Sequence, residues 1–340
     1  MRTITLEEHF LTPEALKATE HVRDAGLALS YHDPKLKADL LDIGAGRVAA
    51  MDASGIDLQV LSLAVCGVEE LEADQAVAIA HDTNEQVAAA VRAYPKRFAG
   101  FATLALQDPE KAAAELEYCV NKLGFCGALI NGTTKGAFLD HPKFTPLLEV
   151  AQSLDVPIYI HPAPPPKSVR DTYYSDLPNY AGDILAAGGW GWHSEVALES
   201  LRLIAAGVFD RFPKLKIIIG HMGEYLPFSI GRVDRIFSRS HLSFTFGPTY
   251  NGDWKRLERK VVDYFHENFY ITTSGFYTLP PLLLALQVMG SDRVLFSVDY
   301  PFAANEPCRE FLNTLSSRVL MNEEDIAKLV GGNAEKLLRV

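Results

Sequence analysis

The segment VPIYIH, residues 156–161, is an apolar run that ends in a histidine, and KIIIGH, residues 216–221, repeats this pattern further along the chain. TITLEEH at residues 3–9 and VLFSVD at residues 294–299 also end in an imidazole or a carboxylate. Apolar, β-branched runs without strict alternation are typical of parallel strands that are buried on both faces. Polar groups at the ends of several such strands predict one shared pocket at the mouth of a barrel.

Strand candidates alternate with helical patterns along the whole chain. The strands are predicted at 3–7, 57–63, 98–104, 125–130, 156–160, 215–220, 269–273 and 293–298. Helical stretches are predicted at 73–94, 109–123, 142–154, 194–206 and 305–316, with one or two closing helices at 322–338. This alternation favours an α/β fold, a (β/α)8 TIM barrel that forms a single domain over residues 1–340, rather than a doubly wound sheet.

Two segments lie outside the bare pattern of a barrel. Residues 11–55 form an insertion after the first strand, with a helix expected at 38–54. Residues 162–190 form a long loop after the fifth strand that is rich in Pro, Gly and Tyr. Long loops on compact domains commonly serve as lids or binding loops. Because this loop follows His161, we expect it to cover the active face.

The composition excludes several classes of function. The chain has 32 basic and 43 acidic residues, a formal net charge of -11, and no basic stripe along a predicted helix, so nucleic acid is not an expected partner. The four cysteines form no C-x-x-C pair, which is typical of reduced thiols in a cytosolic protein. No segment approaches the roughly 18 apolar residues of a membrane span, and the first residues lack the apolar core of a signal peptide. We therefore expect a cytoplasmic protein with no membrane partner.

Glu7 and His9 lie two residues apart at the end of the first predicted strand. Residues two apart in a strand point to the same face, so these two side chains could share a metal ion while Glu8 points elsewhere. The alternative is that Glu7 and Glu8 are ordinary surface carboxylates near the chain terminus. The E-x-H pattern alone does not decide between the two interpretations.

His161, His221 and Asp299 end three further strands. Imidazole is the commonest metal ligand near neutral pH, and a buried carboxylate is costly unless it is paired or coordinated. A satisfied core histidine is the alternative for each imidazole, but the shared position at strand ends favours an active-site role. Glu224 follows three residues after His221, at the expected start of a helix. It either orients the second ring nitrogen of His221 or only complements the helix dipole.

Longer motifs carry a resemblance to a known family. The most specific are GHMGE at residues 220–224 and FSVDYPF at 296–302, and LEEHF at 6–10 agrees with them. On these motifs the chain resembles the amidohydrolase superfamily over essentially its whole length. It looks most like the branch of metal-dependent non-oxidative decarboxylases. That branch includes aminocarboxymuconate semialdehyde decarboxylase and the γ-resorcylate, 2,3-dihydroxybenzoate and 5-carboxyvanillate decarboxylases.

The resemblance implies a role for each candidate residue. The implied metal ligands are Glu7, His9, His161 and Asp299; the resemblance also implies that His221 lies beside the metal, supported by Glu224, and that Arg232 matches an active-site arginine. We expect Asp299, His221 and Glu224 to be catalytic and Arg232, Phe302 and Phe10 to bind substrate. Relatives with two metals carry a lysine at the end of the fourth strand, where this chain has Asn131. One divalent metal ion, Zn2+ or Mn2+, is therefore expected.

The expected activity is metal-dependent decarboxylation of an ortho-hydroxy aromatic acid by a homodimer or homotetramer. Protonating the ring carbon first avoids an aryl carbanion, and Asp299 is the candidate acid. Close hydroxybenzoate relatives carry Arg-Asn after the His-Pro of the fifth strand, whereas this chain has Ala163 and Pro164, so the ring pattern of the substrate stays open. Two alternatives remain: a one-metal hydrolase of an ester, lactone or C–C bond, and a catalytically silent barrel that only binds.

Overall fold

The computed structural model describes residues 2–21, 32–239, 257–317 and 321–340. Within them, parallel strands lie in the hydrogen-bonded orders β1-β2-β3 and β4-β5-β6-β7-β8. The strands are β1 (Ile4–Phe10), β2 (Leu58–Leu63), β3 (Phe98–Gly100), β4 (Ala128–Asn131), β5 (Ile158–His161), β6 (Ile217–Ile219), β7 (Phe269–Thr272) and β8 (Val294–Leu295). Every predicted strand is present. Only β1 extends well beyond its predicted end, because residues 8–10 continue to pair with β2.

Two isolated bridges join these groups of strands into one closed barrel. Ala102 pairs with Ala128 between the ends of β3 and β4, and Glu8 pairs with Tyr300 between β1 and the segment after β8. The N–H of His9 also donates to the carbonyl of Tyr300 at 2.7 Å. A closed ring of parallel strands with helices outside confirms the predicted (β/α)8 barrel.

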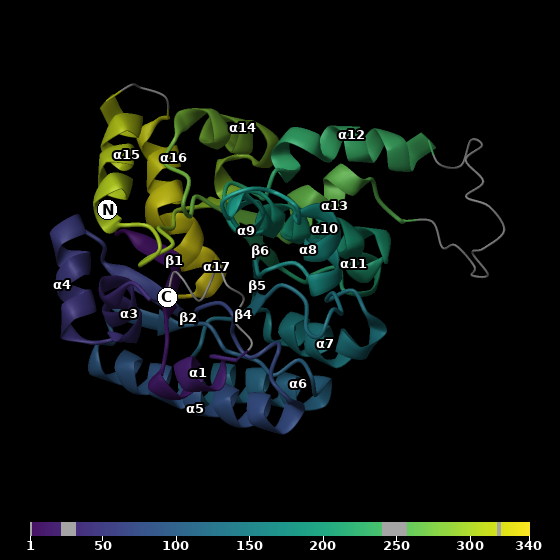
Figure 1. The fold of residues 1–340 in the computed structure, drawn as a ribbon. Coiled ribbons are helices and arrows are strands. Elements are labelled where there is room, and N and C mark those ends of the chain that lie inside the picture. Colours follow the sequence, from purple (N-terminus) through teal and green to yellow (C-terminus); the bar gives the residue numbers. More distant parts are fainter. Residues whose placement is uncertain (1, 22–31, 240–256, 318–320) are drawn as a thin grey trace.

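Helices cover the outside of the barrel (Figure 1). The five predicted stretches correspond to α5 (Ala73–Ala93), α6 (Pro109–Tyr118), α7 (Thr145–Leu154), α10 (Gly191–Ala205) and α15 (Asn305–Ser317). The others on the barrel are α11 (Val208–Arg211), α12 (Leu226–Arg239), α13 (Val261–Asn268) and α14 (Leu279–Met289). The closing helices are α16 (Glu323–Ala327) and α17 (Asn333–Leu338). Asp108 caps α6 by accepting the N–H of Lys111, which satisfies one of the free donors of the first turn.

Apolar side chains fill the interior of the barrel. They come from the inward faces of the strands, for example Leu6, Val60 and Phe101, and they pack with Leu337 and Leu338 of α17. A second, larger core lies between the strands and the surrounding helices. The strand ends that carry polar groups are therefore held by packing on both faces.

A β-bulge decides which residues of β1 face the interior. Because Leu6 belongs to the interior core, simple alternation would place Glu8 inside as well. The pairing of β1 with β2, however, shifts by one residue between Thr5 and Glu8. The extra residue turns Glu7 and His9 inward instead. Bulges commonly re-aim a side chain in this way beside an active site.

The insertion after β1 is present, but its predicted helix at 38–54 is wrong. The insertion contains α1 (Pro13–Ala18), α3 (Pro34–Leu41) and α4 (Ala45–Ser54), and its residues 22–31 lie outside the described part of the chain. The chain leaves the helical path between α3 and α4, where Asp42 Oδ1 accepts the N–H of Gly44 at 2.8 Å. A short polar side chain that bonds to nearby main chain competes with the helix in this way.

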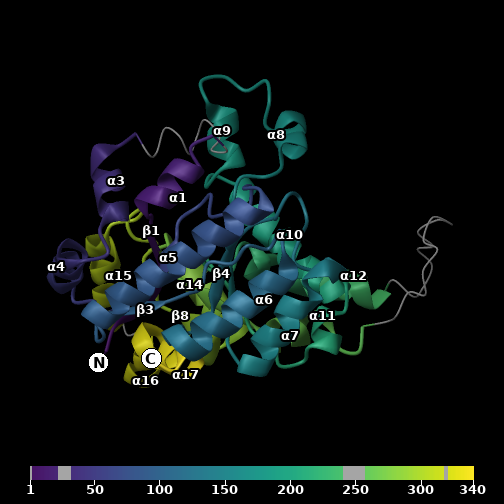
Figure 2. The same cartoon turned by 90° about the horizontal axis from the view of Figure 1, so that it is seen from below.

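The segment after β5 contains two short helices, α8 (Lys167–Tyr173) and α9 (Ala181–Ala186), where a loop was expected. Figure 2 shows α1, α3, α8 and α9 on one side of the barrel, and both termini with α16 and α17 on the opposite side. Because β1 leads into α1 and β5 into α8, the first side is the mouth at the carboxyl ends of the strands. Residues 162–190 lie at this mouth, and their closing as a lid stays a prediction. In the described part of the chain, no helix is long and apolar enough to span a bilayer.

Candidate active site

The four residues predicted as metal ligands come together at the barrel mouth. Glu7 and His9 lie in β1, His161 ends β5 and Asp299 follows β8. Each offers one ligand atom, and these atoms lie within 4.8 Å of one another. His9 Nε2 is 3.3 Å from Asp299 Oδ1, and His161 Nε2 is 3.4 Å from Glu7 Oε1. The side chains of Glu7 and Glu8 are fully buried, so the surface-carboxylate interpretation is wrong.

The chemistry of this cluster fits a divalent cation. Glu7 Oε1 and His9 Nε2 are buried and have no hydrogen-bond partner among the described residues. A buried carboxylate oxygen and a buried ring nitrogen without partners are costly unless something else satisfies them. Two imidazole nitrogens and two carboxylates form a ligand set that suits Zn2+ or Mn2+. The residues that would hold the ion are Glu7, His9, His161 and Asp299.

Hydrogen bonds to one oxygen of the Glu7 carboxylate orient its other oxygen towards this cluster. Tyr159 and Ser274 donate to Glu7 Oε2, and Thr272 Oγ1 lies 3.4 Å from the same oxygen. Glu7 Oε1 is thereby left to face the imidazoles. Such outer partners commonly orient metal ligands and tune their affinity.

Both histidines of the cluster have a partner at the opposite ring nitrogen. Ser62 Oγ lies 3.3 Å from His9 Nδ1, and Asn131 Oδ1 lies 2.9 Å from His161 Nδ1. In each ring Nε2 is the atom that faces the cluster. This is the usual arrangement around a metal-binding histidine.

A second cluster of His193, Glu224 and His221 adjoins the first. Glu224 Oε1 is 2.7 Å from His221 Nδ1, and Glu224 Oε2 is 2.6 Å from His193 Nδ1. His221 Nε2 faces the first cluster, 3.5 Å from Glu7 Oε1 and 3.9 Å from Asp299 Oδ2. Glu224 therefore orients the second ring nitrogen of His221, which was one of the two interpretations of this residue.

The placement of Glu224 at a helix start is wrong. Residues 221–225 form a left-handed turn, with φ values of 50° at His221, 58° at Met222, 85° at Gly223, 53° at Glu224 and 64° at Tyr225. The α12 helix begins only after them, at residue 226. For residues other than glycine this conformation costs roughly 1–2 kcal/mol each. Strain of this kind persists where the surroundings enforce it, commonly at functional sites.

Burial and neighbouring charges set the protonation of the site. Burial disfavours the charged form of His221, but the carboxylate of Glu224 outweighs it and raises the pKa of His221 well above its ordinary value. Burial would raise the pKa of Asp299, but the neighbouring imidazoles of His221 and His9 keep that pKa below its ordinary value. Burial and the neighbouring His9 lower the pKa of His161, which favours the neutral form that a metal ligand needs. For both groups the direction of the pKa shift favours the charged form, a protonated His221 beside an ionised Asp299.

The three residues expected to bind substrate are placed differently from one another. The Phe302 ring lies at the mouth, with its centroid 5.6 Å from that of His9. Phe10 is fully buried in the core outside the strands, because the bulge in β1 turns it away from the interior. Arg232 lies on the exposed side of α12. The structure therefore brings Phe302 to the cluster and does not bring Phe10 there.

Sequence reasoning alone misses His193, Tyr159 and Glu69. His193 lies near the start of α10 in the stretch GGWGWH, so it has no strand-end signal. Tyr159 sits inside the apolar run of β5, where an aromatic residue is expected on packing grounds alone. Glu69 lies in the segment between β2 and α5, where a carboxylate is ordinarily exposed, yet here it is 4 % exposed.

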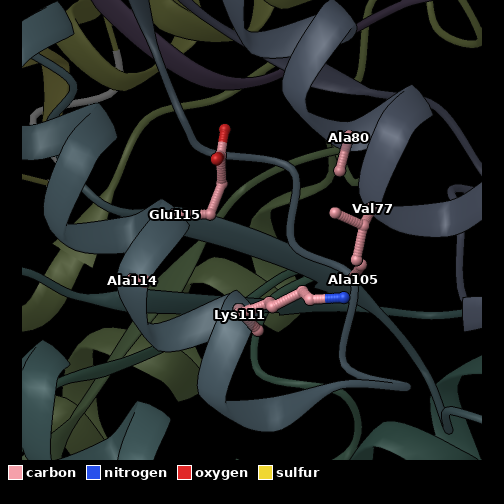
Figure 3. A pocket seen from close by; sticks show the side chains of 7 residues that line it. Val77, Ala80, Ala105, Lys111, Ala114 and Glu115 are labelled. Carbon is pink, nitrogen blue, oxygen red and sulfur yellow. The ribbon is translucent and has the colours of Figure 1, made fainter. Parts of the chain in front are cut away.

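A hollow of about 240 Å³ is lined by residues of α5 and α6 and by Ala105, and none of the residues of the two clusters lines it. Figure 3 shows its lining, which consists of small apolar side chains with Lys111 and Glu115. Glu115 is already engaged, because it lies 3.2 Å from His81 Nδ1 and accepts from Asn84 at 2.8 Å. The hollow therefore lacks the converging free polar groups that distinguish the barrel mouth.

Comparisons with known proteins agree with this geometry. The family described as amidohydrolase matches residues 32–340. A γ-resorcylate decarboxylase of a Polaromonas species is 39% identical over 99% of this chain and 98% of its own length. The crystal structure of 5-carboxyvanillate decarboxylase from Sphingomonas paucimobilis has a TM-score of 0.89 at 32% identity, and covers 100% of this chain and 99% of that one.

A third relative is described with bound ligands. The crystal structure of a dihydroxybenzoic acid decarboxylase from Polaromonas contains manganese and the inhibitor 2-nitroresorcinol. It has a TM-score of 0.84 at 38% identity, and covers 99% of this chain and 97% of that one. The chain therefore belongs to the amidohydrolase family, in the branch of carboxy-lyases that contains the γ-resorcylate and 5-carboxyvanillate decarboxylases.

Proposed function

We propose that this protein removes the carboxylate of an ortho-hydroxy aromatic acid, such as a dihydroxybenzoate, without oxidation and with one divalent metal ion. The observation that carries the proposal is the position of Asp299 between the two clusters. Asp299 Oδ1 is 3.3 Å from His9 Nε2, and Asp299 Oδ2 is 3.9 Å from His221 Nε2. The Asp299 carboxylate thus lies between the proposed metal ligands and the His221 imidazole. From this position it can pass a proton from His221 to a substrate anion bound at the metal.

The chemistry requires a proton before it releases CO2. Direct loss of CO2 from an aromatic ring would leave an aryl carbanion, which is strongly basic. An ortho hydroxyl, held as phenolate, can instead push electrons into the ring while a proton is added to the carbon that bears the carboxylate. The C–C bond then breaks, its electron pair restores the aromatic ring, and CO2 leaves.

His221 and Asp299 are the residues proposed to deliver that proton. The raised pKa of His221 favours a protonated imidazole before the reaction. His221 Nε2 passes it to Asp299 Oδ2, and Asp299 adds it to the ring carbon as a general acid. Glu224 stabilises the imidazolium from the other side, at 2.7 Å from His221 Nδ1. A divalent cation held by Glu7, His9, His161 and Asp299 would supply Lewis-acid stabilisation of the anionic oxygens of the substrate.

The proposed substrate class rests on the relatives and on the rim of the site. Relatives of 32–39% identity are decarboxylases of γ-resorcylate and 5-carboxyvanillate. The aromatic rings of Phe302 and Phe276 lie beside the clusters, with centroids 5.6 Å from that of His9 and 6.2 Å from that of His221. Such rings suit a flat aromatic substrate. Substrate binding by Arg232 stays a prediction.

A substrate panel tests this proposal. Metal-free protein is reconstituted with Mn2+ or Zn2+, and CO2 release is measured with salicylate, 2,3-dihydroxybenzoate and 2,6-dihydroxybenzoate. We expect equal amounts of CO2 and phenol, and in deuterium oxide one deuterium at the vacated ring carbon. 4-Hydroxybenzoate, which lacks an ortho hydroxyl, is the control that should not react. Hydrolysis of esters or lactones without CO2 release from any acid would contradict the proposal and favour the hydrolase alternative.

The expected homodimer or homotetramer and the cytoplasmic location stay predictions. The apolar stretch 280–289 forms most of α14, where Leu282, Ala285 and Met289 are buried in the core and Leu283 is exposed. Larger exposed apolar side chains lie at the mouth, on or near α8 and α9: Tyr173, Leu177, Tyr180, Ile184 and Trp190. Light scattering coupled to size-exclusion chromatography measures the assembly directly.

A further inference from the structure

Asn131 links a buried carboxylate to one of the metal-binding histidines. It ends β4, in register with His161 at the end of β5. Its Oδ1 lies 2.9 Å from His161 Nδ1. On its other side, Glu69 Oε1 accepts the main-chain N–H of Asn131 at 2.8 Å and its Nδ2 at 3.3 Å. Both residues are buried, at 4 % and 3 % exposure for Glu69 and Asn131, so water does not compete for these bonds.

These contacts determine which way the Asn131 amide points. A side-chain amide has one donating and one accepting end, and the choice follows from the hydrogen bonds around it. Glu69 Oε1 can only accept, so the NH2 group of Asn131 must face it. The carbonyl oxygen of Asn131 must then face His161 Nδ1, which therefore has to carry a proton.

The tautomer of His161 follows from that orientation. A neutral imidazole with its proton on Nδ1 has a lone pair on Nε2. His161 Nε2 is the atom that faces the ligand cluster, 3.4 Å from Glu7 Oε1. The opposite tautomer would place a proton there and block coordination. Glu69 thus determines the tautomer of His161 indirectly: it orients the amide of Asn131, and Asn131 in turn determines that His161 Nδ1 carries the proton.

The orientation holds in both protonation states of Glu69. Its Oε2 is buried and has no hydrogen-bond partner in residues 2–21, 32–239, 257–317 and 321–340, so a proton on this carboxyl would sit on Oε2 and leave Oε1 as the acceptor. Gly67 leaves the necessary room, since a Cβ at that position would lie 2.0 Å from Glu69 Oε2 and 2.6 Å from Asn131 Nδ2.

We propose that Glu69 and Asn131 are positioning residues that select the Nδ1–H tautomer of His161 and so present its Nε2 lone pair to the metal. The proposal deepens the metal site on which the proposed function rests. Asn131, at the end of β4, then orients a metal ligand instead of being one. Glu69, between β2 and α5, becomes a further residue that supports the site. Partners of this kind typically change metal affinity or activity by about 10–100-fold.

Two measurements that use no substrate test this proposal on the full-length protein. Mn2+ affinity is measured by titration calorimetry on metal-free protein. The His161 tautomer is read from the imidazole 15N shifts of 15N-histidine-labelled protein, assigned with His161→Gln. We expect Asn131→Leu and Glu69→Met to weaken Mn2+ binding by about 10–100-fold and to abolish the uniform Nδ1–H state. Glu69→Gln keeps an acceptor for Asn131 and should remain close to wild type.

Matched controls separate this role from a general loss of stability. Asn268→Leu removes another buried asparagine, which donates to Pro213 O and Leu215 O, and Glu199→Gln changes another buried carboxylate, which accepts from Leu139 N. Both should keep wild-type Mn2+ affinity. If Asn131→Leu does not fold, the difference between Glu69→Met and Glu69→Gln decides the question.

The proposal is overturned if the foldable variants keep wild-type Mn2+ affinity, or if affinity falls while His161 keeps its Nδ1–H state. A protein that binds Mn2+ and shows these shifts but decarboxylates none of the acids would overturn the proposed function alone.

Discussion

Ser297 Oγ accepts the main-chain N–H groups of Leu6 and Glu7, at 3.2 Å and 2.8 Å. These are the residues where the pairing of β1 with β2 shifts by one position. A bulge leaves a main-chain group without its regular partner in the sheet, and this hydroxyl supplies one. A single side chain after β8 thereby stabilises the bulge that turns Glu7 and His9 into the barrel.

Replacing this hydroxyl should loosen the bulge. We expect Ser297→Ala to lower the free energy of unfolding by about 1–3 kcal/mol, because two buried N–H groups lose their acceptor. Mn2+ affinity should fall about tenfold or more, because Glu7 is no longer held. Chemical unfolding and metal titration measure the two effects. Ser200→Ala is the matched control, since the buried Ser200 hydroxyl has no hydrogen-bond partner in the part of the chain that the structure describes, and its loss should change neither quantity. Equal changes in unfolding free energy and in Mn2+ affinity for the two variants would argue against a role of Ser297 in holding the bulge.

Asp299→Asn should separate metal binding from chemistry. The variant keeps an oxygen that can face His9, but it cannot carry a proton from His221 to the ring carbon. We expect metal to stay bound while turnover falls by at least about 100-fold, the usual contribution of a general acid. Metal content by mass spectrometry and CO2 release by a coupled assay measure the two properties. Near-normal turnover of a metal-loaded variant would remove Asp299 from the proton path.

Removing the metal should destabilise the folded protein measurably. Within the described part of the chain, Glu7 Oε1 and His9 Nε2 have no hydrogen-bond partner, so a bound cation would stabilise the folded state, and it has no matching site in the unfolded chain. At a free Mn2+ concentration of 100 times the dissociation constant the gain is about 2.7 kcal/mol. Thermal unfolding with chelator and with increasing Mn2+ tests this. A midpoint that does not respond to Mn2+ would mean that the cluster does not bind it.

Gly223→Ala should damage the left-handed turn that carries His221 and Glu224. Gly223 has a φ of 85°, and a Cβ there would lie 2.9 Å from the ring of Pro227 and 3.2 Å from Ile271 Cγ2. We expect a loss of about 1–3 kcal/mol in the free energy of unfolding and a clear fall in kcat, because the turn must shift.

The control for this variant is Gly124→Ala, which shares a positive φ of 75° but meets no atom within 4 Å. Its cost should be limited to about 1 kcal/mol of backbone strain, with kcat unchanged. If both variants reduce kcat equally, the effect does not come from the turn.

Glu199→Gln should change how stability depends on pH. Burial raises the pKa of Glu199 from its ordinary value of 4.5 to about 8. Because the folded value is the higher one, the stabilisation from its proton is fully present below pH 4.5 and is lost as the pH rises to about 8. Relative to Glu199→Gln, wild-type protein should lose on the order of 1 kcal/mol per pH unit across this window. Urea unfolding of both proteins from pH 5 to pH 8 measures the difference, and parallel curves would show that Glu199 does not titrate there.

The sequence predicts the barrel because its strands are short, apolar and buried on both faces, which makes each one visible as a run such as KIIIG. It also predicts that Glu7, His9, His161 and Asp299 come together, because strand ends in a barrel meet at one mouth. Glu224 is correctly expected beside His221, but the left-handed turn that places it there is invisible, since four of its five residues are not glycine. His193 is invisible for another reason: it reaches the site from a helix of the outer layer.

The sequence by itself determined the fold class and the acid and imidazole groups of the site, because local hydrophobic pattern and strand-end position are local properties. Only the tertiary structure shows how Glu7 and His9 face the interior although Leu6 does so too, since this depends on a bulge that Ser297 holds from the far end of the chain. The same is true of the hydrogen-bond chain from Glu69 through Asn131 to His161. The direction in which these side chains point is determined by hydrogen bonds between segments that are distant in the sequence. It cannot be predicted from either segment alone, because no single segment contains both partners.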